Sequence, residues 1–121
     1  MFKIFYLTNC GYSRAALETL EKFNISNLSN QINCDDKNNF TSDPNHVFVP
    51  SDYTSYPKIL FVSKNSDSIF IGGNDELDKL INLVTTPIIC TNEKIPSQRF
   101  ISRRTTCKIL LALQGIKQKQ N

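Results

Sequence analysis

Apolar residues of this chain occur in two kinds of pattern, short continuous runs and runs with helical spacing. Residues 2–7 are largely apolar, aromatic and β-branched, a composition that predicts a buried strand. From Arg14 onward apolar side chains recur every three or four positions, which predicts a helix with one buried face. Only Thr8 and Asn9 separate the strand from Cys10, so the sequence places this cysteine at the N-terminal end of the helix.

The middle of the chain combines a weak strand pattern with many turn residues. Residues 25–34 predict a weak second strand, and the polar residues 35–39 predict a turn after it. Residues 40–55 contain too many Pro, Asp and Asn residues for a long helix, although Pro44 is suited to open a short one. We therefore expect residues 40–55 to be the most irregular part of the domain.

Regular patterns return in the second half of the chain. Residues 58–63 and 68–71 predict two adjacent antiparallel strands joined by a tight turn at residues 64–67. Asn74 is a good N-cap, acidic residues suit the first turn after it, and helical spacing continues to a predicted end near Thr85. The sequence thus predicts an α/β chain in which strands and helices alternate.

Length and composition limit the class of protein. With 121 residues, of which 40% are apolar, the chain is expected to fold as one domain. The opening apolar run is too short for a secretory signal, and no stretch approaches the roughly 20 apolar residues of a membrane span, so we expect a soluble cytoplasmic protein without a membrane partner. The wide spacing of the four cysteines argues against a disulfide scaffold or a zinc site and favours a reducing compartment. These cysteines are Cys10, Cys34, Cys90 and Cys107.

Positive charge is concentrated at the C-terminal end. Residues 1–93 hold 7 Lys and Arg against 11 Asp and Glu, whereas residues 94–121 hold 7 Lys and Arg and no acidic residue. Clustered positive charge attracts polyanions independently of their sequence, so residues 94–121 are candidates for contact with nucleic acid. A solvated basic helix or tail explains the same composition.

The predicted position of Cys10 favours its thiolate form. Unpaired backbone N–H groups and the positive end of the helix dipole stabilise negative charge at a helix N-terminus. Arg14, about one turn further on, adds a cation that acts in the same direction. Since the thiolate is the attacking species in thiol–disulfide exchange, Cys10 and Arg14 are candidate catalytic residues. An inert thiol at the end of a buried strand is the alternative interpretation.

Three short motifs follow one another in the chain: Cys-Gly-Tyr-Ser at residues 10–13, Tyr-Pro at 56–57 and Gly-Gly-Asn-Asp at 72–75. In this order and spacing they resemble the glutaredoxin family of the thioredoxin-like proteins, in its monothiol form. The resemblance implies an α/β thioredoxin-like fold of three layers, with a mixed four-stranded sheet flanked by helices. It covers residues 2–84 and does not extend to the basic C-terminal end.

The resemblance therefore divides the chain in two. Residues 1–86 are expected to form a glutaredoxin-like domain, and residues 87–121 a basic C-terminal extension. Within the extension, Thr105 or Thr106 is suited to cap a last helix that ends at Gln114. Such a helix could pack on the domain through its apolar stripe.

The same resemblance implies a role for individual residues. Cys10 corresponds to the nucleophile, and Ser13, in place of a resolving cysteine, becomes a hydroxyl donor to the thiolate in a monothiol cycle. Pro57 corresponds to the cis-proline of the fold, and Tyr56, larger than the usual residue there, would offer its backbone to a bound peptide. The implied glutathione-binding residues are Tyr12, Tyr56, Pro57, Gly73, Asn74 and Asp75. The family lysine that binds the glycyl carboxylate is missing, which leaves that contact unassigned among Lys3, Arg14, Lys37 and Lys58.

Three functional hypotheses follow. The leading one is a glutathione-dependent oxidoreductase that reduces glutathionylated or disulfide-bonded partners, proteins or small molecules, with glutathione as co-substrate. The second is a [2Fe–2S] carrier, in which Cys10 and glutathione supply the thiolate ligands between two protomers. Members of that type usually carry an inserted loop before the motif, and here only two residues separate the strand from Cys10, which favours catalysis. The third is a redox-inactive adaptor that binds nucleic acid through residues 94–121.

Overall fold

The computed structural model describes residues 1–26, 29–63, 68–84 and 98–119. The predicted turn at residues 64–67 and Cys90 lie outside these ranges. The elements in chain order are β1 (Phe2–Tyr6), α1 (Gly11–Lys22), β2 (Ser29–Asn33), α2 (Asn38–Thr41), η2 (Pro44–Phe48), β3 (Lys58–Val62), β4 (Ser68–Gly72), α3 (Asn74–Val84) and α4 (Arg103–Lys119).

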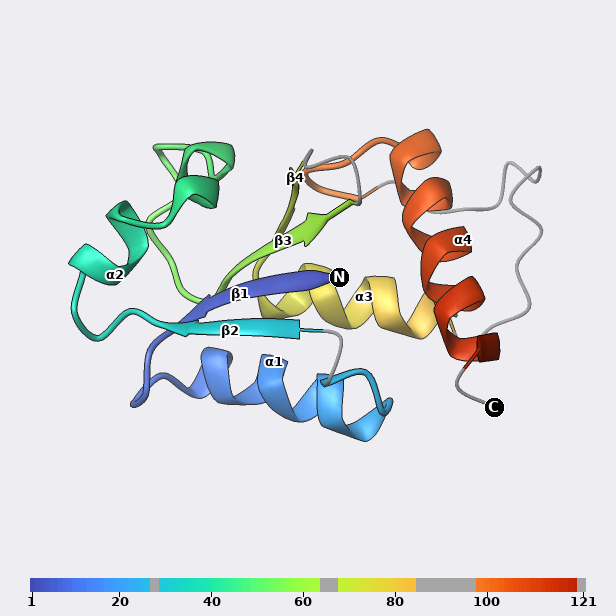
Figure 1. Ribbon diagram of the computed structural model, residues 1–121, viewed down its shortest axis with the longest axis horizontal. Helices are drawn as coiled ribbons and strands as arrows, with labels where there is room; N and C mark the ends of the chain where they lie inside the picture. Colours follow the sequence, from blue (N-terminus) through green and yellow to red (C-terminus); the bar gives the residue numbers. More distant parts are fainter. Residues whose placement is uncertain (27–28, 64–67, 85–97, 120–121) are drawn as a thin grey trace.

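The four strands form one mixed sheet in the order β2-β1-β3-β4. β1 pairs in parallel with β2 and antiparallel with β3, and β3 pairs antiparallel with β4 (Figure 1). Because Tyr6 lies opposite Asn33 in the parallel pair, the segments that follow β1 and β2 leave the sheet at the same end, where both strands have their carboxyl termini. The predicted α/β class with a mixed four-stranded sheet is confirmed, including the weakly patterned second strand.

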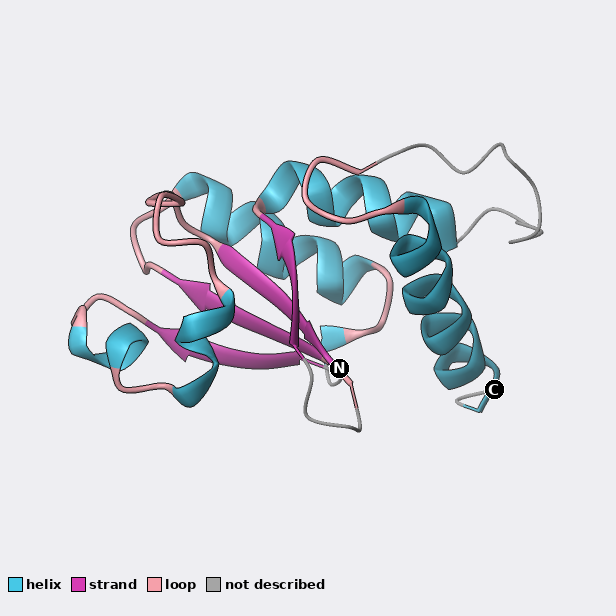
Figure 2. Ribbon diagram, turned by 90° about the horizontal axis from the view of Figure 1, so that it is seen from above, coloured by secondary structure: helices cyan, strands magenta, loops and turns pink. Residues whose placement is uncertain are grey.

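Helices cover both faces of the sheet, because successive side chains of each strand point to opposite sides. Phe2 and Ile4 of β1 are buried in the larger core, which α1, α3 and α4 complete on one face. Phe5 belongs to a second cluster on the other face, where Phe40 of α2 and Tyr56 pack against it. Figure 2 shows the two long helices α1 and α3 on one side of the strands and the short helices on the other.

The short helices follow the turn residues of the sequence. α2 begins at Asn38, within the predicted turn, and η2 begins at Pro44 as predicted. Asp43 accepts a hydrogen bond from the backbone N–H of Asn45, at 2.8 Å, and so caps η2. A buried ion pair between Asp43 and Lys3 of β1, at 2.9 Å, ties this region to the sheet.

The start of α3 differs from the prediction by one residue. α3 begins at Asn74, so the N-cap position falls on Gly73, whose carbonyl accepts from Leu77 N–H at 3.0 Å. The side chain of Glu76 reaches back and accepts from Gly73 N–H at 3.0 Å. The prediction of Asn74 as N-cap is wrong: Gly73 takes this position, and Glu76 accepts from its N–H as the acidic residue of a capping box does.

The last helix also begins earlier than predicted. Ser102, not Thr105 or Thr106, is the cap: its Oγ accepts from Thr105 N–H at 3.1 Å, and its carbonyl accepts from Thr106 N–H at 2.9 Å. α4 then continues past the predicted end at Gln114 to Lys119.

α4 packs on the domain through the predicted apolar stripe. Ile109, Leu110 and Leu113 are buried in the same core as α1 and α3, and Ile101 joins them from the segment before the helix. In both ribbon views α4 lies beside the C-terminal end of α3 (Figures 1 and 2). Among the described residues, no helix combines the length and the apolar character needed to cross a bilayer.

Candidate active site

Cys10 lies where β1 leads into α1. Its backbone is extended, with φ −112° and ψ 119°, and it occupies the N-cap position of the helix. Its carbonyl accepts the first helical hydrogen bond, from Arg14 N–H at 3.0 Å. The side chain of Cys10 is half-buried, whereas Gly11 and Tyr12 after it are exposed. The predicted placement of Cys10 at a helix N-terminus is confirmed, and its sulfur remains open to a ligand.

Ser13 connects the strand to the sulfur of Cys10. Its side chain is fully buried, and its Oγ accepts a hydrogen bond from Leu7 N–H at 3.2 Å. Desolvation by burial raises the pKa of Cys10, but the Ser13 hydroxyl and the backbone N–H groups of Ser13 and Tyr12 lower it by more, so the pKa lies below its ordinary value. Arg14 is exposed, and the donors that lower the pKa belong to Ser13 and Tyr12.

The Tyr56–Pro57 peptide bond is cis and lies directly against Cys10. The sulfur of Cys10 is 3.7 Å from the carbonyl oxygen of Tyr56, a contact across 46 positions of sequence. Pro57 is buried, and β3 begins at the next residue. Two of the three sequence motifs therefore meet at one sulfur atom.

Lys58 holds the segment that carries this cis peptide. It is almost fully buried, and its Nζ donates to the carbonyl oxygens of Tyr53 at 2.7 Å and Ser55 at 3.1 Å. The ammonium group also faces the rings of Tyr56, Tyr53 and Phe40, at 4.5, 5.4 and 5.4 Å from their centroids. Burial lowers the pKa of Lys58. Lys58 therefore fixes the conformation of residues 53–56, a role that sequence analysis did not assign.

A groove of about 160 Å³ opens beside the cis peptide. It brings together all six residues that the resemblance proposed for glutathione binding, from α1, the cis-proline segment and the start of α3. Four further residues complete its lining. The lining residues are Tyr12, Tyr53, Ser55, Tyr56, Pro57, Gly73, Asn74, Asp75, Glu76 and Arg99.

Gly73 lies close to the Tyr53 ring in this groove. A Cβ at Gly73 would lie 2.5 Å from the Tyr53 hydroxyl, so a larger residue there requires the Tyr53 side chain to shift. Asn74 and Asp75 follow in the first turn of α3, where Asp75 is exposed. The first turn of α3 therefore lines the groove with two acidic residues, the exposed Asp75 and the buried Glu76.

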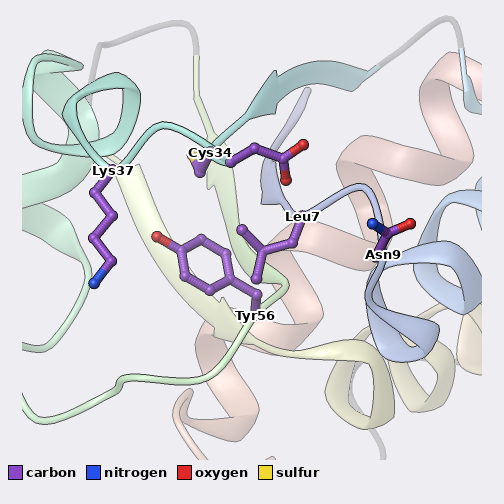
Figure 3. A pocket seen from close by; sticks show the side chains of 6 residues that line it. Leu7, Asn9, Cys34, Lys37 and Tyr56 are labelled. Carbon is purple, nitrogen blue, oxygen red and sulfur yellow. The ribbon is translucent and has the colours of Figure 1, made fainter.

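A second pocket, of about 370 Å³, lies on the other side of Tyr56, which lines both hollows. In Figure 3 the ring of Tyr56 lies between Lys37 and Leu7. Lys37 comes from the turn after β2 and supplies a cation to this pocket. The lining residues are Leu7, Asn9, Cys34, Asp35, Lys37 and Tyr56.

Hydrogen bonds fix the loop between β1 and Cys10 from the side of the second pocket. Asp35 accepts from the backbone N–H of Thr8 at 2.9 Å and also from its hydroxyl, and these bonds lower the pKa of Asp35. Asn33 donates from its amide to the Thr8 hydroxyl at 2.8 Å. The end of β2 thus holds the residues that lead to the reactive sulfur.

The other cysteines differ from Cys10. Cys34 is buried, and desolvation raises its pKa, with Asp43 and Asp35 adding to the rise and Lys58 opposing it. Cys107 is half-buried on α4. Within the described part of the chain, no three His, Cys, Asp or Glu side chains are grouped to hold a metal ion. Of the three cysteines that the structure describes, Cys10 is therefore the one whose pKa is lowered by its surroundings.

Comparison of the chain with models of protein families, with curated proteins and with solved structures finds no match. The sulfur of Cys10 contacts the backbone carbonyl of Tyr56, the residue that lines both hollows. Asp75 lines the hollow at the start of α3, and Lys37 lines the other. Such a site is suited to hold a short peptide in extended form with its sulfur beside Cys10.

Proposed function

We propose that this chain is a glutathione-dependent thiol–disulfide oxidoreductase of the glutaredoxin type, acting through Cys10 alone. The observation that carries the proposal is the contact of Cys10 with the Tyr56 carbonyl at 3.7 Å, beside the cis Tyr56–Pro57 bond. Tyr56 and Pro57 also line the groove that includes Gly73–Asp75. Three motifs from distant parts of the sequence meet there. The strand order and the helices on both faces are compatible with a thioredoxin-like fold.

The two hollows suggest how glutathione would lie. The cysteinyl part would pair with the backbone of Tyr56, as a strand adds to a sheet edge. The γ-glutamyl end would occupy the groove at the start of α3, where Asp75 faces its amine. The glycyl carboxylate, which sequence analysis left unassigned, would meet Lys37 in the second pocket.

The reaction follows from one nucleophile. The Cys10 thiolate attacks the glutathione sulfur of a mixed disulfide, which forms the Cys10–glutathione disulfide and breaks the substrate disulfide. The substrate leaves as a thiolate and takes a proton from solvent. A second glutathione thiolate then attacks the bound glutathione sulfur, which releases glutathione disulfide and restores the Cys10 thiolate. Overall, the substrate sulfur is reduced to a thiol and the sulfur of the second glutathione is oxidised.

Loss of the Cys10 thiol tests the proposal directly. With a glutathionylated peptide as substrate and glutathione as reductant, Cys10→Ser should abolish turnover, because a hydroxyl is not ionised at neutral pH. Cys107→Ser removes a thiol outside both pockets and should retain turnover. Mass spectrometry of the unsubstituted chain after reaction with glutathione disulfide should place one glutathione on Cys10.

Two results would contradict the proposal. Turnover that survives Cys10→Ser would place the chemistry elsewhere. A chain that fails to reduce the peptide but is isolated under anaerobic conditions as a brown, glutathione-dependent dimer would instead support the [2Fe–2S] carrier, with Cys10 as its protein ligand.

A further inference from the structure

The segment before α4 adds a charged residue to the groove at the start of α3. Arg99 lines this groove together with Tyr56 and Asp75, although it lies outside the part of the chain that resembles glutaredoxins. The described chain passes from Gln98 through Arg99 and Phe100 into α4. The C-terminal extension is therefore part of the wall of the proposed binding site.

Phe100 fixes the position of this segment. Its ring packs edge-on against Phe70 at 4.9 Å and against Tyr53 at 5.6 Å, between ring centroids. It also covers Gly72, where a Cβ would lie 2.9 Å from a Phe100 ring carbon. The guanidinium of Arg99 lies over the same ring, with its carbon 4.8 Å from the centroid. Arg99 is thus held next to the groove by a packed aromatic cluster.

The charge of Arg99 remains available to a ligand. Among the described residues, no carboxylate forms an ion pair with Arg99. Glu76, the buried acid of the groove, already accepts from Gly73 N–H. Tyr53 lies among these charges: burial raises its pKa, Glu76 raises it further, Arg99 lowers it and Asp75 raises it. The groove therefore presents an unpaired cation and the exposed carboxylate of Asp75 around one tyrosine.

We propose that Arg99 binds the α-carboxylate of the γ-glutamyl end of glutathione, while Asp75 faces the α-amine. The inference rests on the proposed function and adds a specificity residue to it. A group with adjacent ammonium and carboxylate charges matches the two exposed charged side chains of the groove, Asp75 and Arg99, which have opposite signs. The C-terminal extension would thereby help to select γ-glutamyl thiols over thiols without this head group.

A binding experiment tests this role without the chemistry. Cys10→Ser in the full chain prevents a disulfide between glutathione and residue 10, and NMR titration with reduced glutathione then gives its Kd. Added Arg99→Gln should weaken binding about three- to fivefold, as expected for an exposed ion pair. Arg99→Lys should lose less, because it keeps the charge but not the planar fork. Arg103→Gln removes an exposed charge of the same extension and should leave the Kd unchanged.

A second peptide identifies the group that Arg99 binds. 4-Aminobutyryl-cysteinyl-glycine lacks only the α-carboxylate of the γ-glutamyl residue. It should bind the parent chain more weakly than glutathione does, and Arg99→Gln should not change its Kd, because the shared interaction is already absent. The difference in affinity between glutathione and this peptide should also become smaller at high salt, because salt screens an exposed ion pair.

The outcomes separate the two proposals. Two results would overturn the role of Arg99 and leave the oxidoreductase proposal intact. One is an equal Kd for glutathione with and without the Arg99→Gln substitution. The other is that Arg99→Gln weakens the binding of both peptides by the same factor. No measurable binding of glutathione by the Cys10→Ser chain would overturn both.

Discussion

Removal of the Ser13 hydroxyl should make Cys10 a weaker nucleophile at neutral pH. Ser13 Oγ accepts from Leu7 N–H at 3.2 Å, which leaves its proton free to face the sulfur. Ser13→Ala therefore removes one of the donors that lower the pKa of Cys10. Burial, which acts in the opposite direction, remains. The pKa of Cys10 should rise toward its ordinary value, so a smaller fraction of the sulfur is ionised at pH 7.

The size of the effect follows from one hydrogen bond. A net contribution of about 0.5 to 1.5 kcal/mol corresponds to a roughly twofold to tenfold slower alkylation at pH 7. The same substitution leaves Leu7 N–H without its partner, at a cost of about 1 to 2 kcal/mol of folding free energy. Because the folded pKa of Cys10 lies below its unfolded value, ionisation stabilises the fold above about pH 8.5, and this contribution is lost as pH falls through the folded pKa.

The assay is the rate of alkylation by iodoacetamide between pH 4 and pH 10, followed by mass spectrometry of the Cys10 peptide. Ser13→Ala should move the midpoint to higher pH, and urea unfolding should report the lost stability. Thr19→Ala removes another hydroxyl from α1, one that donates to the Ala15 carbonyl at 3.0 Å, and should leave the midpoint unchanged. An unchanged midpoint in Ser13→Ala would refute the role of this hydroxyl.

Two further substitutions test how the walls of the site are held. Lys58→Met should destabilise the fold by about 2 to 3 kcal/mol in urea unfolding, because the carbonyls of Tyr53 and Ser55 lose their charged donor. A loss below about 0.5 kcal/mol would contradict the role of Lys58 in holding this segment. Gly72→Ala should lower the free energy of unfolding by about 2 to 4 kcal/mol, because Gly72 has φ +126° and a Cβ there would lie 2.5 Å from a carboxylate oxygen of Glu76. Gly11→Ala is the control: a Cβ there meets nothing within 4 Å, so the substitution should be close to neutral. Equal losses of stability at both positions would be inconsistent with this packing.

Local patterns in the sequence were sufficient to predict most elements. The apolar run before Cys10 and the helical spacing after it fix β1 and α1, because both patterns depend on near neighbours. The prediction of a second strand was also correct: β2 forms despite its polar composition, because its backbone pairs with β1. The two helix starts were misplaced because Gly73, whose N–H donates to Glu76, and Ser102, whose Oγ accepts from Thr105 N–H, occupy the cap positions. That competition is decided by side-chain geometry, which spacing does not contain.

The site was predictable only where motifs marked it. The resemblance named six of the ten residues that line the groove beside Tyr56, and the structure brings those six together. Lys58 was counted only as a nearby cation, because its role depends on carbonyl groups that converge in the fold. Lys37 remained one cation among four, and Arg99 carried no local signal, since its position depends on how Phe100 packs.

The two rims of the groove differ in how freely they can change during evolution or design. At the rim formed by α1, the space around Gly11 is open and Tyr12 is 69% exposed, so substitutions there meet solvent. At the opposite rim, a larger residue in place of Gly73 would have to displace the Tyr53 side chain, which packs against Phe70 and Phe100. Substitutions can therefore accumulate more freely along the α1 rim than along the other.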